Sequence, residues 1–240
     1  MLAPAKIRHN MKIIIYLLLF CTLIISCKKE ALKAPPVDAI TVINMGISGN
    51  TAENLLNRIN TVIKQAPNLV IIMIGTNDAL DGSSTYNSFS STLSIIIDSL
   101  QHTGSSVMLL TPPPIQTWNT ITTNSNCVYS IYFKDICNII YNLSESKACY
   151  YVDIDGELNN ILTSANSHQL FLSDGVHPSA QGDKDIASDI FSYMKTQNVI
   201  AKKIVCFGDS ITFGAYLAGQ GTATGDTYPA ALSNDLNDTN

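Results

Sequence analysis

Charged residues are scarce in this sequence, and no stretch of it is rich in lysine or arginine. Lys and Arg together number 14, Asp and Glu number 19, and the formal net charge at pH 7 is −5 over 240 residues. Proteins that bind nucleic acid or an anionic membrane surface carry a basic patch that faces the phosphates. The charge pattern therefore argues against both partners, and most strongly against nucleic acid.

Two further absences narrow the class of protein. The cysteines and histidines form neither a C-x-x-C pair nor a cluster with metal-ligand spacing, so nothing supports a structural zinc site. The sequence has no G-x-S-x-G motif, which leaves the α/β-hydrolase fold with its nucleophile elbow unsupported. What is present is 46% hydrophobic residues, enough for the core of a single domain of ordinary size.

The longest apolar run, residues 13–26, predicts a signal segment rather than a membrane span. It is shorter than the ~20 residues that a spanning helix needs. It also follows the basic residues Lys6, Arg8 and Lys12 and ends in a small residue, as secretory signals do. Met11 is the expected start of this segment.

The end of this run, residues 24–27, resembles the lipobox of bacterial lipoproteins. Cleavage there would leave Cys27 as the first residue, carrying lipid; an ordinary signal peptide followed by an unrelated cysteine is the alternative. Residues 28–38 are polar, contain proline and show no hydrophobic period, which predicts a tether. The expected organisation is a signal peptide over residues 1–27, the tether, and one domain over residues 39–240. The expected location is the cell envelope of a bacterium, at the outer membrane or in the periplasm.

Four cysteines lie in the expected domain: Cys127, Cys137, Cys149 and Cys206. In an exported protein they could form disulfides in three complete pairings. Cys206, however, lies within an apolar strand pattern, where a buried free cysteine behaves as a small hydrophobic residue. We therefore expect mostly free thiols.

Strand and helix patterns alternate along the domain. Five short apolar runs rich in β-branched residues are typical of buried strands, and the segments between them have helical spacing. This alternation predicts an α/β domain with a parallel sheet covered on both faces, because parallel strands need right-handed crossovers. The expected strands are residues 39–45, 69–74, 107–110, 150–154 and 203–207. The expected helices are residues 52–65, 88–102, 131–144 and 181–195.

In such sheets the functional site lies beyond the carboxyl ends of the strands. Four segments rich in glycine and polar residues are expected at this edge. They are residues 46–51 after the first strand, 75–78 after the second, 173–179 beyond the fourth and 208–212 after the last. Because they share one edge of the sheet, we expect them to form one site.

Ser210, His177 and Asp174 have the side chains for nucleophilic catalysis. Ser210 lies on a strand-to-helix turn, where it can act as a nucleophile if a base takes its proton. The D-x-x-H spacing lets one loop present the imidazole of His177 while the carboxylate of Asp174 holds its other ring nitrogen. Three donors could form an oxyanion hole: the backbone N–H groups of Gly49 and Ser210 and the side-chain amide of Asn77.

Each of these features alone has an ordinary structural explanation. A glycine-containing turn is usually only a loop, Asn77 and Asp78 could cap the helix that follows them, and a single histidine is usually structural. Their convergence on one edge of one predicted sheet favours the catalytic interpretation.

Together the four segments resemble the sequence blocks of the SGNH or GDSL hydrolase family, over nearly all of the expected domain. The nucleophile block is matched by residues 208–214, the glycine block by 44–51, the GxND block by 75–78 and the DxxHP block by 174–178. The resemblance assigns the catalytic and oxyanion roles to the residues named above. It implies ester hydrolysis without metal or organic cofactor. The implied fold is a three-layer α/β/α sandwich, flavodoxin-like, with a five-stranded parallel sheet of order 2-1-3-4-5.

The order of the blocks departs from the family pattern. Family members normally begin with the nucleophile block, whereas here it comes last, with only residues 211–240 beyond its serine. The sequence therefore looks circularly permuted, and the strand at 203–207 is expected to insert between those at 39–45 and 69–74. The link over residues 196–202 is short. This favours a serine that acts within its own chain over one exchanged with a second molecule.

The resemblance implies an acyl ester of a small molecule, a glycan or a lipid as substrate. From the expected surface location, O-acyl groups on carbohydrate are the first candidates, and lysophospholipids or other lipid esters the second. A non-catalytic glycan-binding module that retains the fold is a third interpretation. Loops 79–87, 112–126 and 215–227 are expected to select the substrate, and the single tryptophan, Trp118, lies in the second of them. The membrane is expected as a partner only through the lipid anchor.

Overall fold

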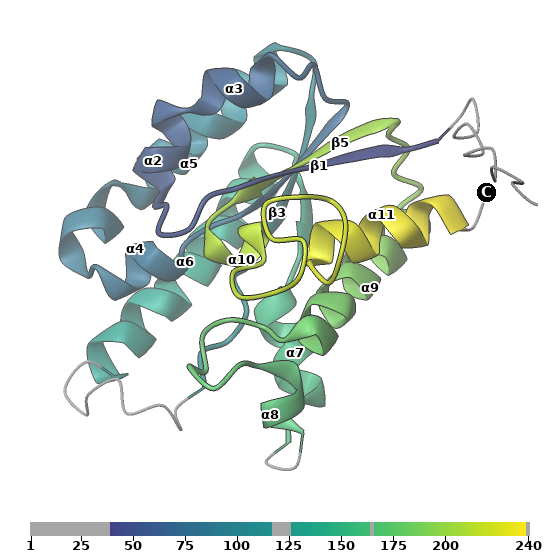
Figure 1. The fold of residues 1–240 in the computed structure, drawn as a ribbon. Coiled ribbons are helices and arrows are strands. Elements are labelled where there is room, and N and C mark those ends of the chain that lie inside the picture. Colours follow the sequence, from purple (N-terminus) through teal and green to yellow (C-terminus); the bar gives the residue numbers. More distant parts are fainter. Residues whose placement is uncertain (1–38, 117–125, 164–165, 239–240) are drawn as a thin grey trace, which may run out of the picture. The chain divides into compact units, whose positions relative to one another are not determined.

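The computed structural model of the chain describes residues 39–116, 126–163 and 166–238, which contain a five-stranded sheet flanked by helices (Figure 1). The predicted signal segment, the tether, Cys27 and Trp118 lie outside the described residues. Within the described part of the chain, no helix combines the length and the hydropathy needed to cross a membrane.

The five strands are all parallel and occur in the order β1-β5-β2-β3-β4. They are β1 (Thr41–Gly46), β2 (Leu69–Met73), β3 (Ser106–Leu110), β4 (Tyr150–Val152) and β5 (Lys203–Gly208). Each lies within two residues of an expected strand. The last strand in the chain lies between the first two, which confirms that prediction: Cys206 is opposite Asn44 on one side and Ile71 on the other.

Helices cover both faces of the sheet, which confirms the three-layer α/β/α architecture (Figure 1). One face packs against α2 (Ala52–Asn57), α3 (Ile59–Ile63), α5 (Ser83–His102) and α6 (Asn126–Ser146). The other face packs against α7 (Ile154–Ile161), α9 (Ala180–Thr196) and α11 (Tyr228–Asp238). The short helices α4 (Thr76–Leu80), α8 (Ser167–Leu170) and α10 (Ser210–Phe213) lie in the connections.

Side-chain alternation along the central strands divides the core into two clusters. In β2, Ile71 and Met73 belong to the cluster under α7, α9 and α11, whereas Val70 and Ile72 belong to the cluster on the other face. This follows from strand geometry, in which successive side chains point to opposite faces. Because both faces are covered, the sequence of β2 is a continuous apolar run rather than an alternating one.

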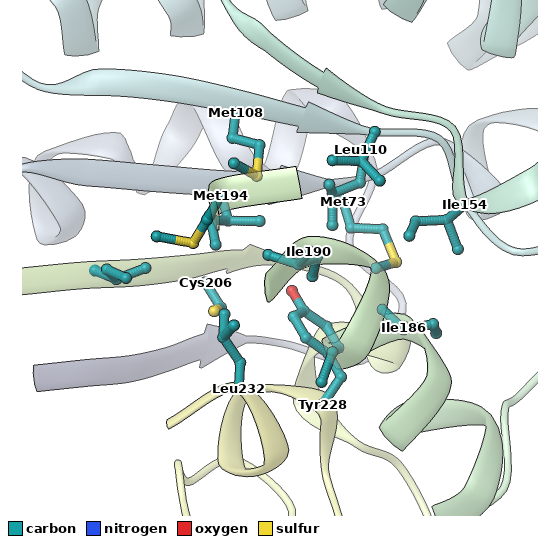
Figure 2. Close-up of a cluster of buried hydrophobic side chains, with 14 of the residues drawn as sticks. Met73, Met108, Leu110, Ile154, Ile186, Ile190, Met194, Cys206, Tyr228 and Leu232 are labelled. Atoms are coloured by element: carbon teal, nitrogen blue, oxygen red, sulfur yellow. The ribbon is translucent and has the colours of Figure 1, made fainter. Parts of the chain in front are cut away.

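The cluster in Figure 2 shows how the end of the chain contributes to the core. Leu232 of α11 and Ile190 and Met194 of α9 pack over Cys206 of β5, and each of these side chains is at most 3% exposed. Full burial of an apolar side chain of this size contributes roughly 1.5 to 3 kcal/mol. The carboxyl-terminal strand and helix are therefore an integral part of the fold.

The helix expected over residues 52–65 is wrong in one respect, because the structure has two helices there. α2 and α3 meet at Arg58, whose φ of −115° and ψ of 12° lie outside the helical region. Buried Leu55 and Val62 keep a helical spacing through the break, so the apolar pattern does not reveal it. The Arg58 side chain instead bonds to acceptors on other segments, a tertiary effect that local spacing cannot report.

The cysteines whose side chains the structure describes are free thiols, as expected. Cys206 is completely buried, while Cys137 and Cys149 are half-buried; the side chain of Cys127 lies outside the described residues. Burial raises the pKa of Cys149 to about 11 and that of Cys206 to about 12. Both thiols are therefore protonated at neutral pH and are poor nucleophiles.

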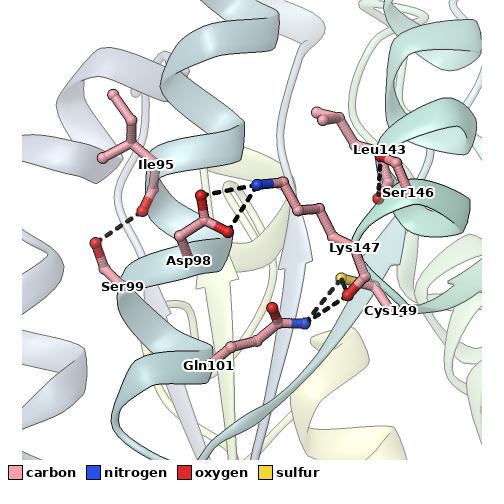
Figure 3. A network of polar contacts seen from close by, with 8 residues as sticks. All are labelled: Ile95, Asp98, Ser99, Gln101, Leu143, Ser146, Lys147 and Cys149. Atoms are coloured by element: carbon pink, nitrogen blue, oxygen red, sulfur yellow. Dashed lines mark hydrogen bonds and ion pairs between the residues drawn. The ribbon is translucent and has the colours of Figure 1, made fainter.

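A polar network near the amino ends of β3 and β4 ties α6 to α5 (Figure 3). Lys147 Nζ lies 2.7 Å and 2.8 Å from the two carboxylate oxygens of Asp98, and Gln101 Nε2 donates to the Lys147 carbonyl at 2.8 Å. The Asp98 side chain is 57% exposed. Solvent screens such a pair, which contributes about 1 kcal/mol or less.

Candidate active site

The carboxyl ends of the strands carry the predicted site residues to one edge of the sheet. Ser210 begins α10 directly after β5, Gly49 follows β1, and Asn77 lies in α4 after β2. Since β5 lies between β1 and β2, these three segments are neighbours. The loop before α9 brings Asp174 and His177 to the same place.

Ser210, His177 and Asp174 form a continuous chain of hydrogen bonds. His177 Nε2 lies 3.0 Å from the hydroxyl oxygen of Ser210, and its Nδ1 lies 2.7 Å from Oδ2 of Asp174. Because the carboxylate accepts the Nδ1 proton, the neutral imidazole has its lone pair on Nε2, facing the hydroxyl. In this arrangement a histidine can take a proton from a serine.

Asp174 is held in its ionised form by its own loop. Its Oδ1 accepts hydrogen bonds from the backbone N–H groups of Val176 and His177, at 2.9 and 3.0 Å. Partial burial raises the pKa of Asp174, but these two amides and the His177 ring lower it more, and the net pKa lies below the ordinary value. The carboxylate is therefore charged at neutral pH, where it orients the imidazole and stabilises its protonated form.

The turn that presents Ser210 is shaped by its neighbours in sequence. A Cβ at Gly208 would collide with the backbone carbonyl of Met73 in β2, so β5 has to end in glycine. Asp209 Oδ1 accepts a hydrogen bond from the N–H of Ile211 at 2.9 Å and thereby caps α10. Ser210 is the first residue of this helix, so its own N–H has no acceptor within the helix and is available as a donor.

Two buried carboxyl groups lie close to the nucleophile. Asp209 is 1% exposed, and burial, with a smaller contribution from the charge of Asp78, raises its pKa to about 7. Burial likewise raises the pKa of Asp78 to about 6. The Asp78 carboxylate accepts a hydrogen bond from the N–H of Ala52, with oxygens at 3.1 and 3.2 Å. It therefore binds the start of α2 and does not cap the helix that follows it, which was the structural alternative to a catalytic role.

The predicted oxyanion donors are held in a restrained geometry. The Asn77 side-chain amide donates one hydrogen to the backbone carbonyl of Asn50 at 2.9 Å, which leaves its second N–H for a ligand. Gly49, next to Asn50, has a φ of 78°, and a Cβ added there would meet nothing within 4 Å. Backbone conformation, rather than crowding in the free protein, therefore explains the glycine.

Tyr216 lies in the loop 215–227 that was expected to select the substrate, but the sequence analysis did not single it out. Its ring lies edge-on to the ring of His177, with centroids 5.2 Å apart and planes at 84°. The residue is 76% exposed and has a φ of 69°, which is rare outside glycine. Nearby, His177, Ser210 and Leu217 line a small surface hollow. No local pattern distinguishes this tyrosine from the others, because its contact with His177 exists only in the folded chain.

The sequence analysis also missed Arg58, which donates hydrogen bonds to the backbone carbonyls of Met45 and Gly208, at the ends of β1 and β5. Among the residues that the structure describes, no group of three or more His, Cys, Asp or Glu side chains is arranged to bind a metal ion.

Comparison with known proteins identifies the class of this enzyme. Residues 30–184 match the model of the GDSL-like lipase/acylhydrolase family. The match spans more than half of the chain, so the chain belongs to this family and is an ester hydrolase. The matched residues include Gly49, Asn77, Asp174 and His177 but end before Ser210. No curated protein is significantly similar to the chain in sequence.

Several solved structures share the fold. A lipase/acylhydrolase from Enterococcus faecalis is 22% identical, with a TM-score of 0.51 over 62% of this chain and 72% of that chain. A variant of Axe2, an acetyl-xylooligosaccharide esterase from Geobacillus stearothermophilus, is 24% identical, with a TM-score of 0.53 over 62% and 69% of the two chains. LAE5, an alpha/beta hydrolase enzyme from the metagenome of Lake Arreo, is 23% identical, with a TM-score of 0.51 over 62% and 69%.

Proposed function

We propose that this ester hydrolase is a serine esterase that works through Ser210, His177 and Asp174. The observation that carries the proposal is the hydrogen-bond chain from Asp174 Oδ2 through both ring nitrogens of His177 to the Ser210 hydroxyl, at 2.7 and 3.0 Å. A serine hydroxyl is a weak nucleophile until a positioned base takes its proton, and His177 is within reach to do so.

Hydrolysis proceeds in two steps in this proposal. The Ser210 oxygen attacks the ester carbonyl while its proton passes to His177 Nε2, and the imidazolium then protonates the leaving alcohol. A water molecule next gives a proton to the same nitrogen and attacks the acyl-enzyme, which releases the acid and restores the serine. In both steps the N–H groups of Ser210 and Gly49 and the amide of Asn77 stabilise the negative charge on the carbonyl oxygen.

The substrate class that we propose is an O-acyl group on carbohydrate. Tyr216 supports this class, since its exposed ring lies beside His177 at the rim of the site, where an aromatic face can pack against the apolar face of a sugar. The likeness of the fold to a protein described as an acetyl-xylooligosaccharide esterase favours the same class. A lipid ester is the second candidate, favoured by the exposed side chain of Ile47 in the loop that carries Gly49.

We also propose that the chain is a circular permutant of the family fold. The family match ends at residue 184, and β5 lies between β1 and β2 although it comes last in the chain. Asn237 hydrogen-bonds both the N–H and the carbonyl of Ile40, at 2.9 and 3.1 Å, so the two ends of the described domain are adjacent. Adjacent ends at the surface are what a circular permutation requires. The distance of 3.0 Å between Ser210 and His177 of one chain supports catalysis within that chain.

Lipid attachment at Cys27 is a separate proposal, which would hold the esterase in the cell envelope, at the outer membrane or in the periplasm. The test is expression in a bacterium that is fed an alkyne-labelled fatty acid. The wild-type protein is expected to take up the label and a Cys27→Ser variant to lose it. Equal labelling of both would contradict the proposal.

The esterase proposal is tested by hydrolysis of p-nitrophenyl acetate, butyrate and octanoate by the purified protein and its Ser210→Ala variant. We expect turnover that depends on Ser210 and is fastest with acetate. Acetylated xylooligosaccharides should then release acetate, and lysophosphatidylcholine should release no fatty acid. Rates that rise with chain length would favour the lipid ester. A folded protein that hydrolyses none of these and binds a glycan saturably would be a binding module, and the proposal would be wrong.

A further inference from the structure

Arg58, at the break between α2 and α3, makes three hydrogen bonds through its guanidinium. Nε donates to Asn50 Oδ1 at 2.7 Å, Nη1 to the Met45 carbonyl at 2.8 Å and Nη2 to the Gly208 carbonyl at 2.9 Å. The guanidinium also lies over the ring of Phe207, with its carbon 4.4 Å from the ring centroid. Short charge-assisted bonds from a planar group in three directions restrain the positions of all its partners.

These acceptors lie next to the proposed oxyanion donors. Asn50 directly follows Gly49, and Gly208 precedes Ser210 by two residues. The third donor is reached through Asn50, whose backbone carbonyl accepts the side-chain amide of Asn77 at 2.9 Å. A single guanidinium therefore directly connects the segments that carry two of the donors, at the carboxyl ends of β1 and β5. It restrains the third donor, Asn77 after β2, through Asn50.

The chemistry of the contacts explains why the residue is an arginine. The three acceptors are neutral oxygens, so the side chain is placed for its geometry and not to neutralise a carboxylate. Burial lowers the pKa of Arg58 to about 10, which leaves the guanidinium protonated at neutral pH. A lysine offers one compact ammonium group, which cannot reproduce a planar fork bonded to three separate segments.

We infer that Arg58 is a positioning residue for the oxyanion hole, an inference that rests on the proposed function. Oxyanion donors act only if they are in place when the charge develops. A misplacement of about 1 Å can cost about 100-fold in rate. Arg58 holds the segments of Gly49 and Ser210 in a fixed relation and, through Asn50, restrains the amide of Asn77. A residue that merely stabilised the fold would lower the unfolding midpoint without lowering kcat selectively.

The first test measures kcat and KM for p-nitrophenyl acetate in Arg58→Ala and Arg58→Lys, well below the unfolding midpoint of each variant. We expect kcat of Arg58→Ala to fall by about 10- to 100-fold with little change in KM. The kcat of Arg58→Lys should fall less than that of Arg58→Ala. Millimolar guanidinium added to Arg58→Ala should partly restore its kcat. The matched control is Leu93→Ala, which removes a buried side chain from the same face of the sheet without touching the donors and should keep its kcat. An unchanged kcat in Arg58→Ala overturns the inference.

A double-variant cycle separates positioning from a general loss of stability. If Arg58 acts through the donors, Arg58→Ala costs less in the Asn77→Ala background than in the wild type, because part of what it positions is already gone. In the Leu93→Ala background, Arg58→Ala should lower kcat by the same factor as in the wild type. If Arg58→Ala also lowers kcat by that full factor in the Asn77→Ala background, the inference is overturned.

Hydrogen exchange tests the inference without any substrate. In Arg58→Ala the amides of residues 46–51 and 208–214 should exchange faster than in the wild type, while those of β3 should keep the wild-type rate. Unchanged exchange in both segments would overturn the positioning role. Absence of Ser210-dependent turnover in the wild type would instead overturn the proposed function, so the two failures are distinguishable.

Discussion

The site is assembled from two segments of unequal size. The amino-terminal segment, residues 39–196, carries four of the five catalytic and oxyanion residues predicted from the sequence. The carboxyl-terminal segment, residues 203–238, carries the fifth, Ser210, and also Tyr216. Yet the short segment provides an interior strand: five of the six residues of β5 are buried, against two of six in β1 at the sheet edge. The last strand of the chain thus completes the sheet and the site together, because β1 and β2 have no partner in common except β5.

Hydrogen bonds outside the strand pairs also join the two segments. They lie at the site, along α9 and α11, and where the two ends of the domain meet. They include Arg58 with Gly208, Asp183 with Tyr228, Ile40 with Asn237 and Asn44 with Thr222. We therefore expect the two segments to fold and unfold as one unit while contributing different chemistry.

The largest effect should come from Ser210→Ala, which removes the catalytic contribution of the carboxyl-terminal segment. Loss of a triad nucleophile lowers kcat by about 10⁴- to 10⁶-fold. We expect this loss in p-nitrophenyl acetate hydrolysis, with an unchanged unfolding midpoint. Ser192→Ala, at an exposed position on α9, is the matched control and should keep full activity.

Mixing Ser210→Ala with His177→Ala tests whether the two segments act within one chain. After the two variants are refolded together, the cis arrangement predicts no recovery of activity. Substantial recovery would show that the carboxyl-terminal segment is exchanged between molecules and would contradict that arrangement.

A smaller loss is expected when the amino-terminal segment loses one oxyanion donor. Asn77→Ala should lower kcat by about 10²- to 10³-fold and leave KM nearly unchanged, because the lost bond strengthens only in the transition state. Steady-state kinetics with p-nitrophenyl acetate provide the measurement, with Asn159→Ala at an exposed position of α7 as control. A normal kcat would remove Asn77 from the mechanism.

Stability measurements should find no difference between the two segments. Leu232 of α11 and Leu93 of α5 are both at most 1% exposed, one in each segment. Truncation of either to alanine should lower the free energy of unfolding by about 2 to 5 kcal/mol. Urea unfolding followed by circular dichroism should show a single transition in both variants. A separate early transition in Leu232→Ala alone would mean that the carboxyl-terminal segment unfolds independently.

The two acids of the site differ in the direction of their pKa shifts, which predicts a pH dependence of stability. Asp174 has a lowered pKa, whereas that of Asp209 is raised from 3.8 to about 7. Between pH 3.8 and about pH 7, the Asp209 carboxyl group is protonated in the folded state and ionised in the unfolded state. The stability contributed by Asp209 is therefore fully present below about pH 4 and is lost as the pH rises through about 7.

The Asp209→Asn variant keeps an acceptor for the Ile211 amide but cannot titrate. Relative to this variant, the wild-type free energy of unfolding should fall by up to about 1.4 kcal/mol per pH unit between about pH 4 and 7. Urea unfolding at several pH values measures it. Asp98→Asn, at an exposed carboxylate, controls for the loss of a charge. A difference between Asp209→Asn and wild type that does not vary with pH would contradict the burial of an ionisable Asp209.

Local patterns predicted most of the fold because the sheet is buried on both faces. The apolar run of β2 and the helical spacing of α9 each reflect burial that a residue's near neighbours already show. The break at Arg58 escaped prediction for the opposite reason: one of its acceptors, the Gly208 carbonyl, lies 150 residues further along the chain. Where the cause of a local conformation is distant in sequence, spacing carries no trace of it.

In the site, too, the residues within local motifs were predicted, whereas those held by contacts distant in sequence were not. The five predicted residues lie in motifs directly after strands or before a helix, and the structure places them at one sheet edge. Tyr216 and Arg58 lie outside those motifs and belong to the site through contacts with His177 and Gly208. The suggestion that Asp78 caps the helix after it was wrong, because its carboxylate accepts a hydrogen bond from the start of α2.

The residue pattern was sufficient to predict the strands, the helices on both faces and the polar groups at the strand ends, since these depend on side-chain period and on residues a few positions apart. The place where β5 inserts was predicted from the resemblance to the SGNH or GDSL family, through the sheet order of that family. The packing of distant segments set the remaining features: the 3.0 Å contact between His177 and Ser210, the burial that raises the pKa of Asp209, and the bonds of Arg58. These depend on positions in space to within about an ångström, which arise only when both segments share one core.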